Sequence, residues 1–346
     1  MGRNKIETAQ SRGRDWVRIL LGLVISLIAL ALVISLIDFK QFVEAIRQAN
    51  LLYLVLGGSM TLLWLVCRGK AWQTLLKNRA TYRDVFFTLN EGYLINNILP
   101  FRLGEVARAY LLGRKAHLNF WDVFSTVLIE RFLDLAFAVG LLFGTVAFAV
   151  NLSWAREVAI GAGVVVFVAL VTLYLLARYQ TLALDWIEKA GKRWVLVKRV
   201  AGTRVASFLN GLTILVDARL FASAVGWIAL NWVVVVVQYY VLLLAFIPNA
   251  QLLWSTFGLG ASALGIAVPS SPGSVGVFEA VLVGALALFG LNVSVTAAYA
   301  FFTHFFNYLF TGILGGYELA HEGETFTSIY RQLRRVQRRD APTPQE

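Results

Sequence analysis

Long apolar stretches separated by short polar segments make up most of this 346-residue chain. A helix needs roughly 20 mainly apolar residues to cross a bilayer, and six stretches approach or exceed that length. We therefore predict an all-α polytopic membrane protein with about six full transmembrane helices. These helices are expected at residues 16–37, 51–66, 123–150, 158–177, 220–246 and 294–317. Between the first two, residues 38–50 carry balanced charges and predict a short amphipathic piece.

Two further apolar stretches are interrupted. Residues 85–99 are too short and too polar for a comfortable span, and basic residues flank them on both sides. Residues 252–291 are broken by the sequence VPSSPGSVG, and their two ends carry no charge. Both patterns predict re-entrant helical hairpins, at about residues 85–113 and 252–291, that enter the membrane from opposite sides. The alternative is two full spans at each break, which would leave every helix short.

The two breaks share a pattern of proline, a glycine four residues later, and a carboxylate within the next turn. The residues are Pro100, Gly104 and Glu105 in the first hairpin, and Pro272, Gly276 and Glu279 in the second. In the second, we expect Ser271 to cap a half-helix that has Pro272 in its first turn. Opposed hairpins indicate an inverted repeat, which in transporters surrounds a substrate site near the membrane midplane. The alternative is an accidental pair of kinked helices, because Pro and Gly are frequent in membrane spans.

Composition and charge set the expected orientation. The chain is 58% hydrophobic and 15% charged, against about 25% charged residues in soluble domains. The net charge is +11. In a membrane protein, an excess of Lys and Arg indicates which loops are cytoplasmic, so we do not interpret it as a sign of nucleic-acid binding. By the positive-inside rule, both termini and residues 68–83 and 178–205 are cytoplasmic, whereas residues 38–50 and 151–157 are outside.

This orientation gives a simple domain organisation. A single transmembrane domain, residues 16–318, lies between cytoplasmic tails at residues 1–15 and 319–346. Within it, residues 178–216 are basic and contain tryptophans, a composition typical of a segment that lies along anionic lipid headgroups.

The first hairpin combines charges with a free helix end. A helix that begins just after Pro100 has unpaired N–H groups and a positive dipole, which favour an anion. Arg102, Glu105 and Arg108 are spaced at i, i+3 and i+6, which predicts one common helical face. We expect the two arginines and the half-helix N-termini to bind a phosphate.

Ionisable residues also enter the predicted spans. Glu130, Arg131 and Asp134 begin one span, and the spacing of Glu130 and Asp134 puts them on one face. An ionisable residue in a span costs roughly 2.5–3.5 kcal/mol, so it normally faces a cavity or a charged partner. The alternative is that Glu130, Arg131 and Asp134 lie at the membrane interface. An interfacial position fits Glu279 less well, because the residues on both sides of it are apolar. We expect these carboxylates and Glu105 to bind a cationic group or a proton.

Other residues limit the chemistry. Asn96 and Asn97 precede the first break, and for them, as for His304 and Asn307, interhelical hydrogen bonds are a more ordinary role than ligand binding. The single cysteine, Cys67, excludes an intramolecular disulfide and a cysteine metal cluster. The three histidines have no metal-ligand spacing, so we predict no metal and no cofactor. The sequence has no GxxxxGK[ST] motif, so we expect no ATP consumption.

At these motifs the chain resembles the lysylphosphatidylglycerol synthase transmembrane, or flippase-like, family. The similar elements are N-N-x-L-P-x-R-x-G-E-x-x-R at residues 96–108, E-R-x-x-D at 130–134 and P-x-x-P-G-x-x-G-x-x-E at 269–279. The resemblance implies a bacterial or archaeal membrane domain that moves lipids, including aminoacylated phospholipids, between leaflets. Because the chain stops at Glu346, without the soluble aminoacyltransferase domain of bifunctional members, we expect no lipid aminoacylation.

Together these features predict a lipid translocase and not an enzyme. Its partners would be a phospholipid or lipid-linked substrate, anionic headgroups, and either a second copy or a lipid-synthesis enzyme. The alternative is an integral membrane enzyme, or a partner subunit, in lipid-linked glycan or aminoacyl-lipid synthesis. The candidate site residues are Asn96, Asn97, Pro100, Arg102, Gly104, Glu105, Arg108, Glu130, Arg131, Asp134, Ser271, Pro272, Gly273, Gly276 and Glu279.

Overall fold

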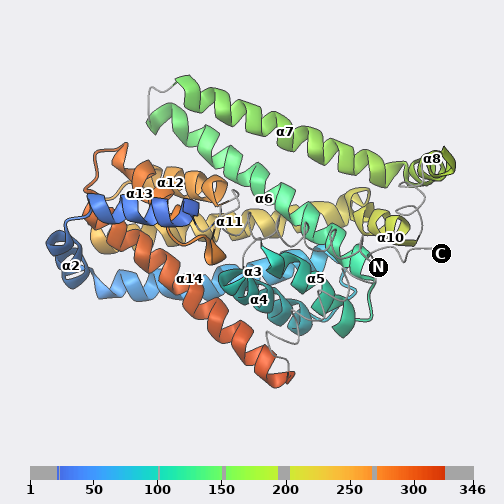
Figure 1. The fold of residues 1–346 in the computed structure, drawn as a ribbon, viewed down its shortest axis with the longest axis horizontal. Coiled ribbons are helices and arrows are strands. Elements are labelled where there is room, and N and C mark those ends of the chain that lie inside the picture. Colours follow the sequence, from blue (N-terminus) through green and yellow to red (C-terminus); the bar gives the residue numbers. More distant parts are fainter. Residues whose placement is uncertain are drawn as a thin grey trace, which may run out of the picture.

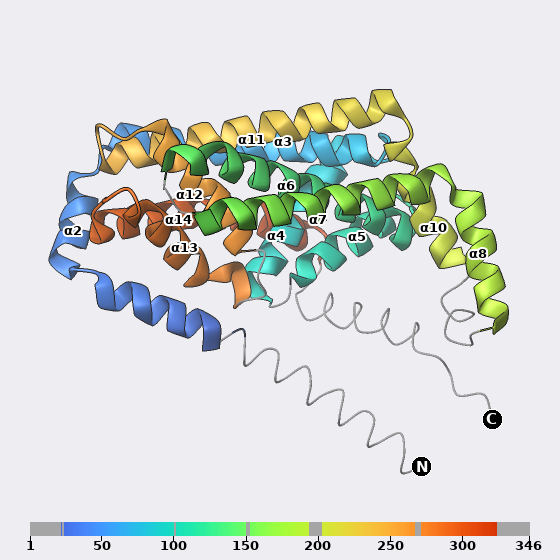
Figure 2. The same cartoon turned by 90° about the horizontal axis from the view of Figure 1, so that it is seen from above.

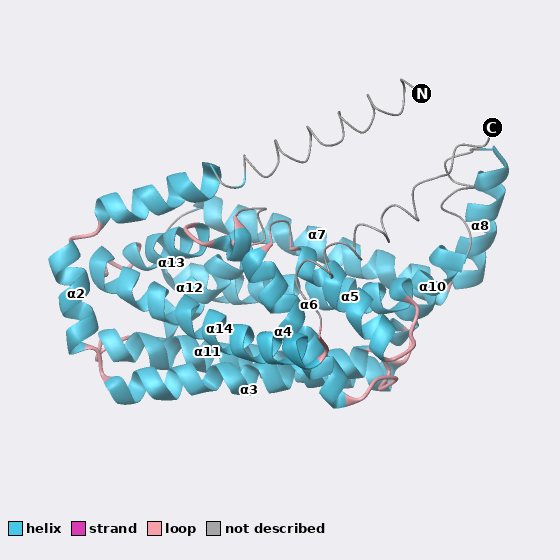
Figure 3. Ribbon diagram, turned by 60° about the horizontal axis from the view of Figure 1, so that its bottom comes forward, coloured by secondary structure: helices cyan, strands magenta, loops and turns pink. Residues whose placement is uncertain are grey.

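The structure, a computed structural model, describes residues 22, 24–99, 102–149, 153–193, 203–266 and 271–323. These residues form helices joined by short turns, with no strand among them (Figure 1, Figure 3). The helices are Val24–Leu36, α2 (Phe39–Gln48), α3 (Leu51–Leu75), α4 (Tyr82–Ile98), α5 (Leu103–Lys115), α6 (Phe120–Ala149), α7 (Ser153–Arg178), α8 (Gln180–Arg193), α10 (Thr203–Leu212), α11 (Ala218–Phe246), α12 (Leu252–Gly265), α13 (Val277–Ala287) and α14 (Val293–His321), with short 3-10 turns η1 (Thr213–Leu215) and η2 (Pro272–Ser274).

Three of the described helices are long and apolar enough to cross a membrane. They are α3, α11 and the part of α7 from Ile160 to Arg178. A fourth candidate is the bent pair formed by Val24–Leu36 and α2, which meet at 83°. The bend follows from a new helix start, because the Asp38 side chain accepts the backbone N–H groups of the first turn of α2. The chain is an all-α membrane protein, as predicted.

Helix α3 is longer than the predicted span 51–66. It continues to Leu75, so Arg68 lies inside the helix and not in a cytoplasmic loop. The helix continues because Trp72 and Leu75 are fully buried and extend its packed face beyond Arg68. The charge on Arg68 is therefore turned into the protein.

Helices α4 and α5 form the first hairpin. The chain leaves α4 at Ile98 and enters α5 at Leu103, whereas Pro100, the predicted tip, lies outside the described residues. Arg102 is the N-cap of α5 and has left-handed backbone angles, φ 51° and ψ 37°. The prediction that Arg102 shares a helical face with Glu105 and Arg108 is therefore wrong for Arg102. The chain must reverse between the two helices, and a left-handed residue turns it sharply.

Helices α12 and α13 form the second hairpin, with η2 between them. The prediction that Pro272 starts the half-helix and Ser271 caps it is wrong, because α13 begins at Val277 and the Ser271 side chain forms no capping bond. Gly273 and Gly276 have φ angles of 63° and 85°. These angles, which glycine adopts without steric cost, take the chain out of the helical path before α13.

Helices α3–α6 and α11–α14 are two units of the same design. Each unit consists of a long helix, two short hairpin helices and a second long helix (Figure 1). The long helices α3 and α11 pack antiparallel, because the N–H of Asn50 donates to the carbonyl of Ala245 and Gln238 donates to Thr61, both at 2.8 Å. The hairpin helix α4 packs along α14, and α12 packs along α6. The two units thus have the same order of long and short helices, with α3, α4, α5 and α6 in the positions of α11, α12, α13 and α14.

The two ends of the bundle carry different helices. Figure 2 shows α2 at one end and α8 with α10 at the opposite end. The predicted surface segment 178–216 is not uniform in its described part. In α8, Trp186 is 75% exposed, which suits a lipid surface, whereas Leu209 and Leu212 of α10 are buried against α6. The apolar face of α10 therefore packs against protein and not against lipid.

Candidate functional site

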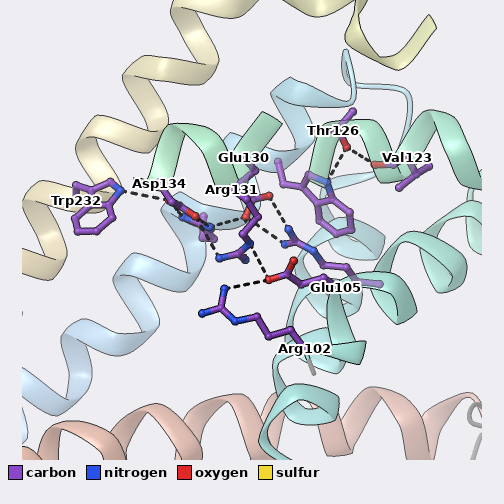
Figure 4. Close-up of polar contacts among 11 residues, drawn as sticks. Arg102, Glu105, Val123, Thr126, Glu130, Arg131, Asp134 and Trp232 are labelled. Atoms are coloured by element: carbon purple, nitrogen blue, oxygen red, sulfur yellow. Dashed lines mark hydrogen bonds and ion pairs between the residues drawn. The ribbon is translucent and has the colours of Figure 1, made fainter. Parts of the chain in front are cut away.

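A buried charged cluster joins α3, α5 and α6. Glu130 and Asp134 lie on one face of α6, as predicted, and Figure 4 shows them projecting into the cluster. Arg68 of α3 donates to Asp134 Oδ1 at 2.6 Å, and its Nη2 lies 2.6 Å from Glu130 Oε1. Arg108 of α5 approaches the same carboxylate, with Nη2 3.1 Å from Glu130 Oε2. Glu130 is thus shared by arginines from two other helices.

The inner part of this cluster is closed to its surroundings. The side chain of Glu130 is 0% exposed, that of Arg108 is 2% exposed and that of Arg68 is 5% exposed. Removing one partner of a buried ion pair typically destabilises a protein by about 3–5 kcal/mol, because an uncompensated charge remains. These three side chains therefore fix α3, α5 and α6 relative to one another.

Two tryptophans hold the inner charges in place. The guanidinium carbon of Arg108 lies 4.7 Å from the centroid of the Trp72 ring, a cation–π contact. The Trp72 indole N–H in turn donates to Thr126 at 3.1 Å. On the other side, the Trp232 indole N–H donates to Asp134 Oδ1 at 3.3 Å. The rotamers of Arg108 and Asp134 are therefore set by neighbours as well as by their ionic partners.

An outer layer of the cluster is partly open. Glu105 of α5 forms ion pairs with two arginines. Arg131 Nε lies 3.0 Å from Glu105 Oε1, and Arg102 Nη1 lies 3.7 Å from the same oxygen. The exposed fraction rises outward, from 20% for Glu105 and 25% for Arg131 to 39% for Arg102. The cluster holds four arginines and three carboxylates, so it has one positive charge in excess.

The first hairpin depends on a close crossing of α4 and α5. A Cβ atom on Gly104 would lie 1.9 Å from the carbonyl oxygen of Gly92, so only glycine fits. The N–H of Gly104 donates to Asn96 Oδ1 at 2.7 Å, which satisfies one free donor at the start of α5. Asn97 donates to Thr311 of α14 at 3.1 Å, the interhelical role expected for it. Both asparagines position the hairpin.

The second hairpin has its own polar centre. Glu279 accepts the N–H of Gly276 at 2.7 Å, and its other oxygen lies 2.5 Å from His304 Nδ1. The second ring nitrogen of His304 lies 3.1 Å from the carbonyl oxygen of Gly273. The Ser271 N–H donates to Ser26 Oγ at 2.9 Å, so the helix Val24–Leu36 also contacts the break.

The predicted site residues therefore fall into two groups. The arginines and carboxylates of the first hairpin and α6 meet in the charged cluster. In the second hairpin, Glu279 contacts Gly276 directly and Gly273 through His304, whereas Ser271 contacts Ser26. Arg102 links the two hairpins, because its guanidinium donates to the carbonyl oxygen of Ile266 at the end of α12.

Sequence reasoning missed several residues of these sites. The sequence pattern predicts a loop at Arg68, whereas Arg68 pairs with Glu130 inside the bundle. The pattern predicts no role for Trp72 and Trp232, which contact Arg108 and Asp134. The available signal was that apolar residues at helical spacing follow Arg68, which predicts a continuing helix. His304 was considered only as an ordinary interhelical residue, and its spacing gave no indication of Glu279 as its partner.

A further ion-pair network was also missed. At the end of α5, Lys115 Nζ lies 3.1 Å from Glu91, 3.3 Å from Glu318 and 2.6 Å from Glu322. This network ties α5 to α4 and to the end of α14. Within the described ranges, no group of three or more His, Cys, Asp or Glu side chains is arranged to hold a metal ion.

A cavity with mixed polar and apolar walls opens at the α2 end of the bundle. Its volume is about 660 Å³, and residues of α2 line it together with the neighbouring ends of α3 and α11. Lys40 and Glu44 bring both signs of charge to its wall, and Asn50 and Tyr53 add neutral polar groups. Leu244, Phe246 and Val295 form an apolar part of the wall of the same cavity.

The model of the lysylphosphatidylglycerol synthase TM region family matches residues 19–315. The match includes both hairpins and the whole charged cluster. The chain belongs to this family. The resemblance carried by the three motifs is thereby confirmed.

Three archaeal proteins are similar to this chain. A UPF0104 membrane protein of Methanothermobacter thermautotrophicus is 27% identical over 305 residues, which cover 80% of this chain and 87% of the relative. A UPF0104 membrane protein of Methanocaldococcus jannaschii is 28% identical over 208 residues, covering 60% and 83%. The glycosyltransferase AglD of Haloferax volcanii is 26% identical over 307 residues, covering 79% of this chain but 49% of AglD.

Proposed function

We propose that this protein is a lipid translocase that moves a phospholipid or lipid-linked polar headgroup between the leaflets of the cytoplasmic membrane. The observation that carries the proposal is the charged cluster, which has four arginines and three carboxylates inside a largely apolar bundle. Ionisable residues at such positions in membrane proteins normally mark substrate or ion pathways. The excess positive charge favours an anionic group such as a lipid phosphate.

Arg102 is the residue best placed to receive that phosphate. It has the most exposed side chain of the cluster, at 39%, and its ionic contact with Glu105 is long, at 3.7 Å. Arg131, whose side chain is 25% exposed, pairs with the same oxygen of Glu105 as Arg102 does. Two guanidinium groups can bind phosphate oxygens in pairs, a geometry that lysine does not reproduce.

The inner arginines have a different role in this proposal. Arg68 and Arg108 are almost fully buried and paired with Glu130, so they position α5 and α6 and do not contact the headgroup directly. Glu105, which contacts both outer arginines, would exchange these contacts when a phosphate arrives. The acyl or prenyl chains would stay in the surrounding lipid during the passage.

The proposed topology has six full spans and two re-entrant hairpins. The spans would be the predicted span 16–37, whose described part includes the helix Val24–Leu36, then α3, α6, α7, α11 and α14. The α4–α5 hairpin would enter from the cytoplasm and the α12–α13 hairpin from outside, with both termini cytoplasmic. In this orientation α8 meets the anionic inner leaflet, and the cavity beside α2 lies on the outer side, where a translocated headgroup could leave.

The second candidate function is an enzyme or a partner subunit in lipid-linked glycan synthesis. The observation that favours it is the match to about half of a protein named as a glycosyltransferase. The described residues, however, present a cluster of paired arginines and carboxylates, which suits a charged lipid headgroup. We therefore propose that the shared region handles the lipid and does not transfer the sugar.

Reconstitution of the purified protein in liposomes tests the proposal. Phospholipids with a fluorescent headgroup are placed in both leaflets, and a membrane-impermeant reductant then quenches the outer leaflet. We expect quenching to proceed beyond the outer leaflet, in contrast to liposomes that contain an unrelated helical membrane protein. A signal that stops at the outer leaflet would contradict translocation. A covalently changed lipid, detected by mass spectrometry, would favour the enzyme.

A further inference from the structure

The imidazole of His304 lies between two acceptors at the second hairpin. Its Nδ1 lies 2.5 Å from Glu279 Oε1, and its Nε2 lies 3.1 Å from the carbonyl oxygen of Gly273. The side chains of His304 and Glu279 are 14% and 17% exposed. This contact joins α14 to the start of α13 and to the break at η2.

The two contacts determine how many protons the pair holds. A carbonyl oxygen only accepts, so the contact with Gly273 requires a hydrogen on Nε2. In a neutral imidazole with that hydrogen, Nδ1 is itself an acceptor and would face an ionised carboxylate, which also only accepts. The contact between His304 and Glu279 therefore requires one more proton, carried by Nδ1 or by the carboxyl group. In both forms the pair is neutral overall.

The repeat of the fold gives this pair a counterpart. Glu105 is the third residue of α5, which begins at Leu103, and Glu279 is the third residue of α13, which begins at Val277. Their partners also correspond. Arg131 is the twelfth residue of α6, which begins at Phe120, and His304 is the twelfth residue of α14, which begins at Val293. The same position thus carries a fixed charge in one unit and a titratable group in the other.

Few other charges surround the pair. The ring of Tyr308 lies 4.6 Å from that of His304, and Arg102 of the first hairpin donates to the nearby end of α12. Glu91 of α4 is paired with Lys115. Within their described residues, α12 and the helix Val24–Leu36 contain no charged side chain, and α13 contains only Glu279. A proton gained or lost at this pair therefore changes most of the local charge.

We propose that the Glu279–His304 pair is a proton-binding site that couples proton movement to the second hairpin. When the proton leaves, His304 has one N–H and two acceptors to satisfy, so its contact with Gly273 or with Glu279 must break. The pair also becomes negatively charged in a largely buried place, which is unfavourable. Proton release thus removes one of the two contacts by which His304 ties α14 to the second hairpin, at η2 or at the start of α13. The proton-binding part stands alone, whereas the coupling part rests on the proposed lipid translocation.

Nuclear magnetic resonance of the histidine rings tests the binding part without any transport. The chain has three histidines, so the signals of 15N-labelled His304 are assigned by comparison with His304→Asn. We expect the His304 signals to change with pH, and Glu279→Gln to alter that titration while leaving His321, at the end of α14, unchanged. Identical His304 titrations in the wild type and in Glu279→Gln would overturn the proton site, whether or not the protein moves lipid.

Liposomes with a pH gradient and a clamped membrane potential test the coupling part. For one proton per lipid, a gradient of one pH unit supports up to about a tenfold lipid ratio between the leaflets. We expect the ratio of lipid in the inner leaflet to lipid in the outer leaflet to differ clearly from one, both in the wild type and in the control His321→Asn. His304→Arg, which copies the fixed charge of Arg131, should fold but give a ratio of one. Wild-type translocation with a ratio of one would overturn the coupling while leaving the proposed function intact.

Discussion

The charged cluster makes a quantitative prediction for Glu130→Gln. The substitution keeps the shape of the side chain but removes the carboxylate that Arg68 and Arg108 share. Arg68 keeps Asp134 as a partner, with a hydrogen bond of 2.6 Å. Arg108 loses its carboxylate partner and keeps a neutral amide acceptor and its cation–π contact with Trp72, which is worth about 0.5–2 kcal/mol.

The expected cost follows from the uncompensated Arg108 charge. Leaving one member of a buried pair alone typically costs about 3–5 kcal/mol, and the side chains of Arg108 and Glu130 are 2% and 0% exposed. We therefore expect Glu130→Gln to destabilise the protein by about 3–5 kcal/mol. The double variant Arg108→Gln with Glu130→Gln removes both charges, so it should cost clearly less than the sum of the two single variants.

Reversible unfolding in lipid nanodiscs or mixed micelles measures these free energies. Glu157→Gln on the exposed face of α7 is the matched control and should stay within about 0.5 kcal/mol of the wild type. If Glu130→Gln is as stable as this control, the cluster does not hold α3, α5 and α6 together. Additive costs in the double variant would show that Arg108 and Glu130 act independently.

Two further predictions concern the fold. Gly104→Ala places a Cβ atom 1.9 Å from the Gly92 carbonyl oxygen and should destabilise the protein by about 1–3 kcal/mol, whereas Gly284→Ala, which meets nothing within 4 Å, should be neutral or slightly stabilising in the same unfolding assay. Equal stability of the two variants would contradict the close crossing of α4 and α5. In a Cys67-free protein in intact cells, a cysteine at Glu44 should react with an impermeant thiol reagent and one at Lys189 should react only after permeabilisation, and the reverse pattern would contradict the proposed orientation.

The sequence allowed the general architecture to be predicted because two local signals are strong. Apolar runs indicate membrane helices, and paired Pro–Gly breaks indicate short helices that turn back. The helix ends at Ile98 and Gly265 lie close to the predicted breaks. The prediction that Ser271 caps the half-helix of the second hairpin is wrong, because Gly276 is the N-cap of α13. The choice between the two residues depends on backbone angles that the local sequence pattern does not determine.

The candidate site was only partly predictable. The spacing of Glu130 and Asp134 correctly put them on one face, since helical periodicity is local. Their partner Arg68 lies 66 positions from Asp134 along the chain, and no spacing rule links the two. The roles of Arg102 and Arg108 also differ in a way that the sequence hides, because Arg108 is 2% exposed and Arg102 is 39% exposed. Burial of that kind is set by packing between helices.

The translocation rate of Arg102→Ala, compared with that of Arg219→Ala, shows whether the charged cluster binds the lipid headgroup. Arg102 is the outermost arginine of the cluster, whereas Arg219 is exposed at the start of α11 and serves as the matched control. Loss of a charge-assisted hydrogen bond of about 1.5–3 kcal/mol corresponds to a rate lower by about tenfold or more. We predict this loss for a headgroup-labelled phospholipid with Arg102→Ala, partial recovery with Arg102→Lys and wild-type rates with Arg219→Ala. Wild-type rates in folded Arg102→Ala protein would contradict headgroup binding by the cluster.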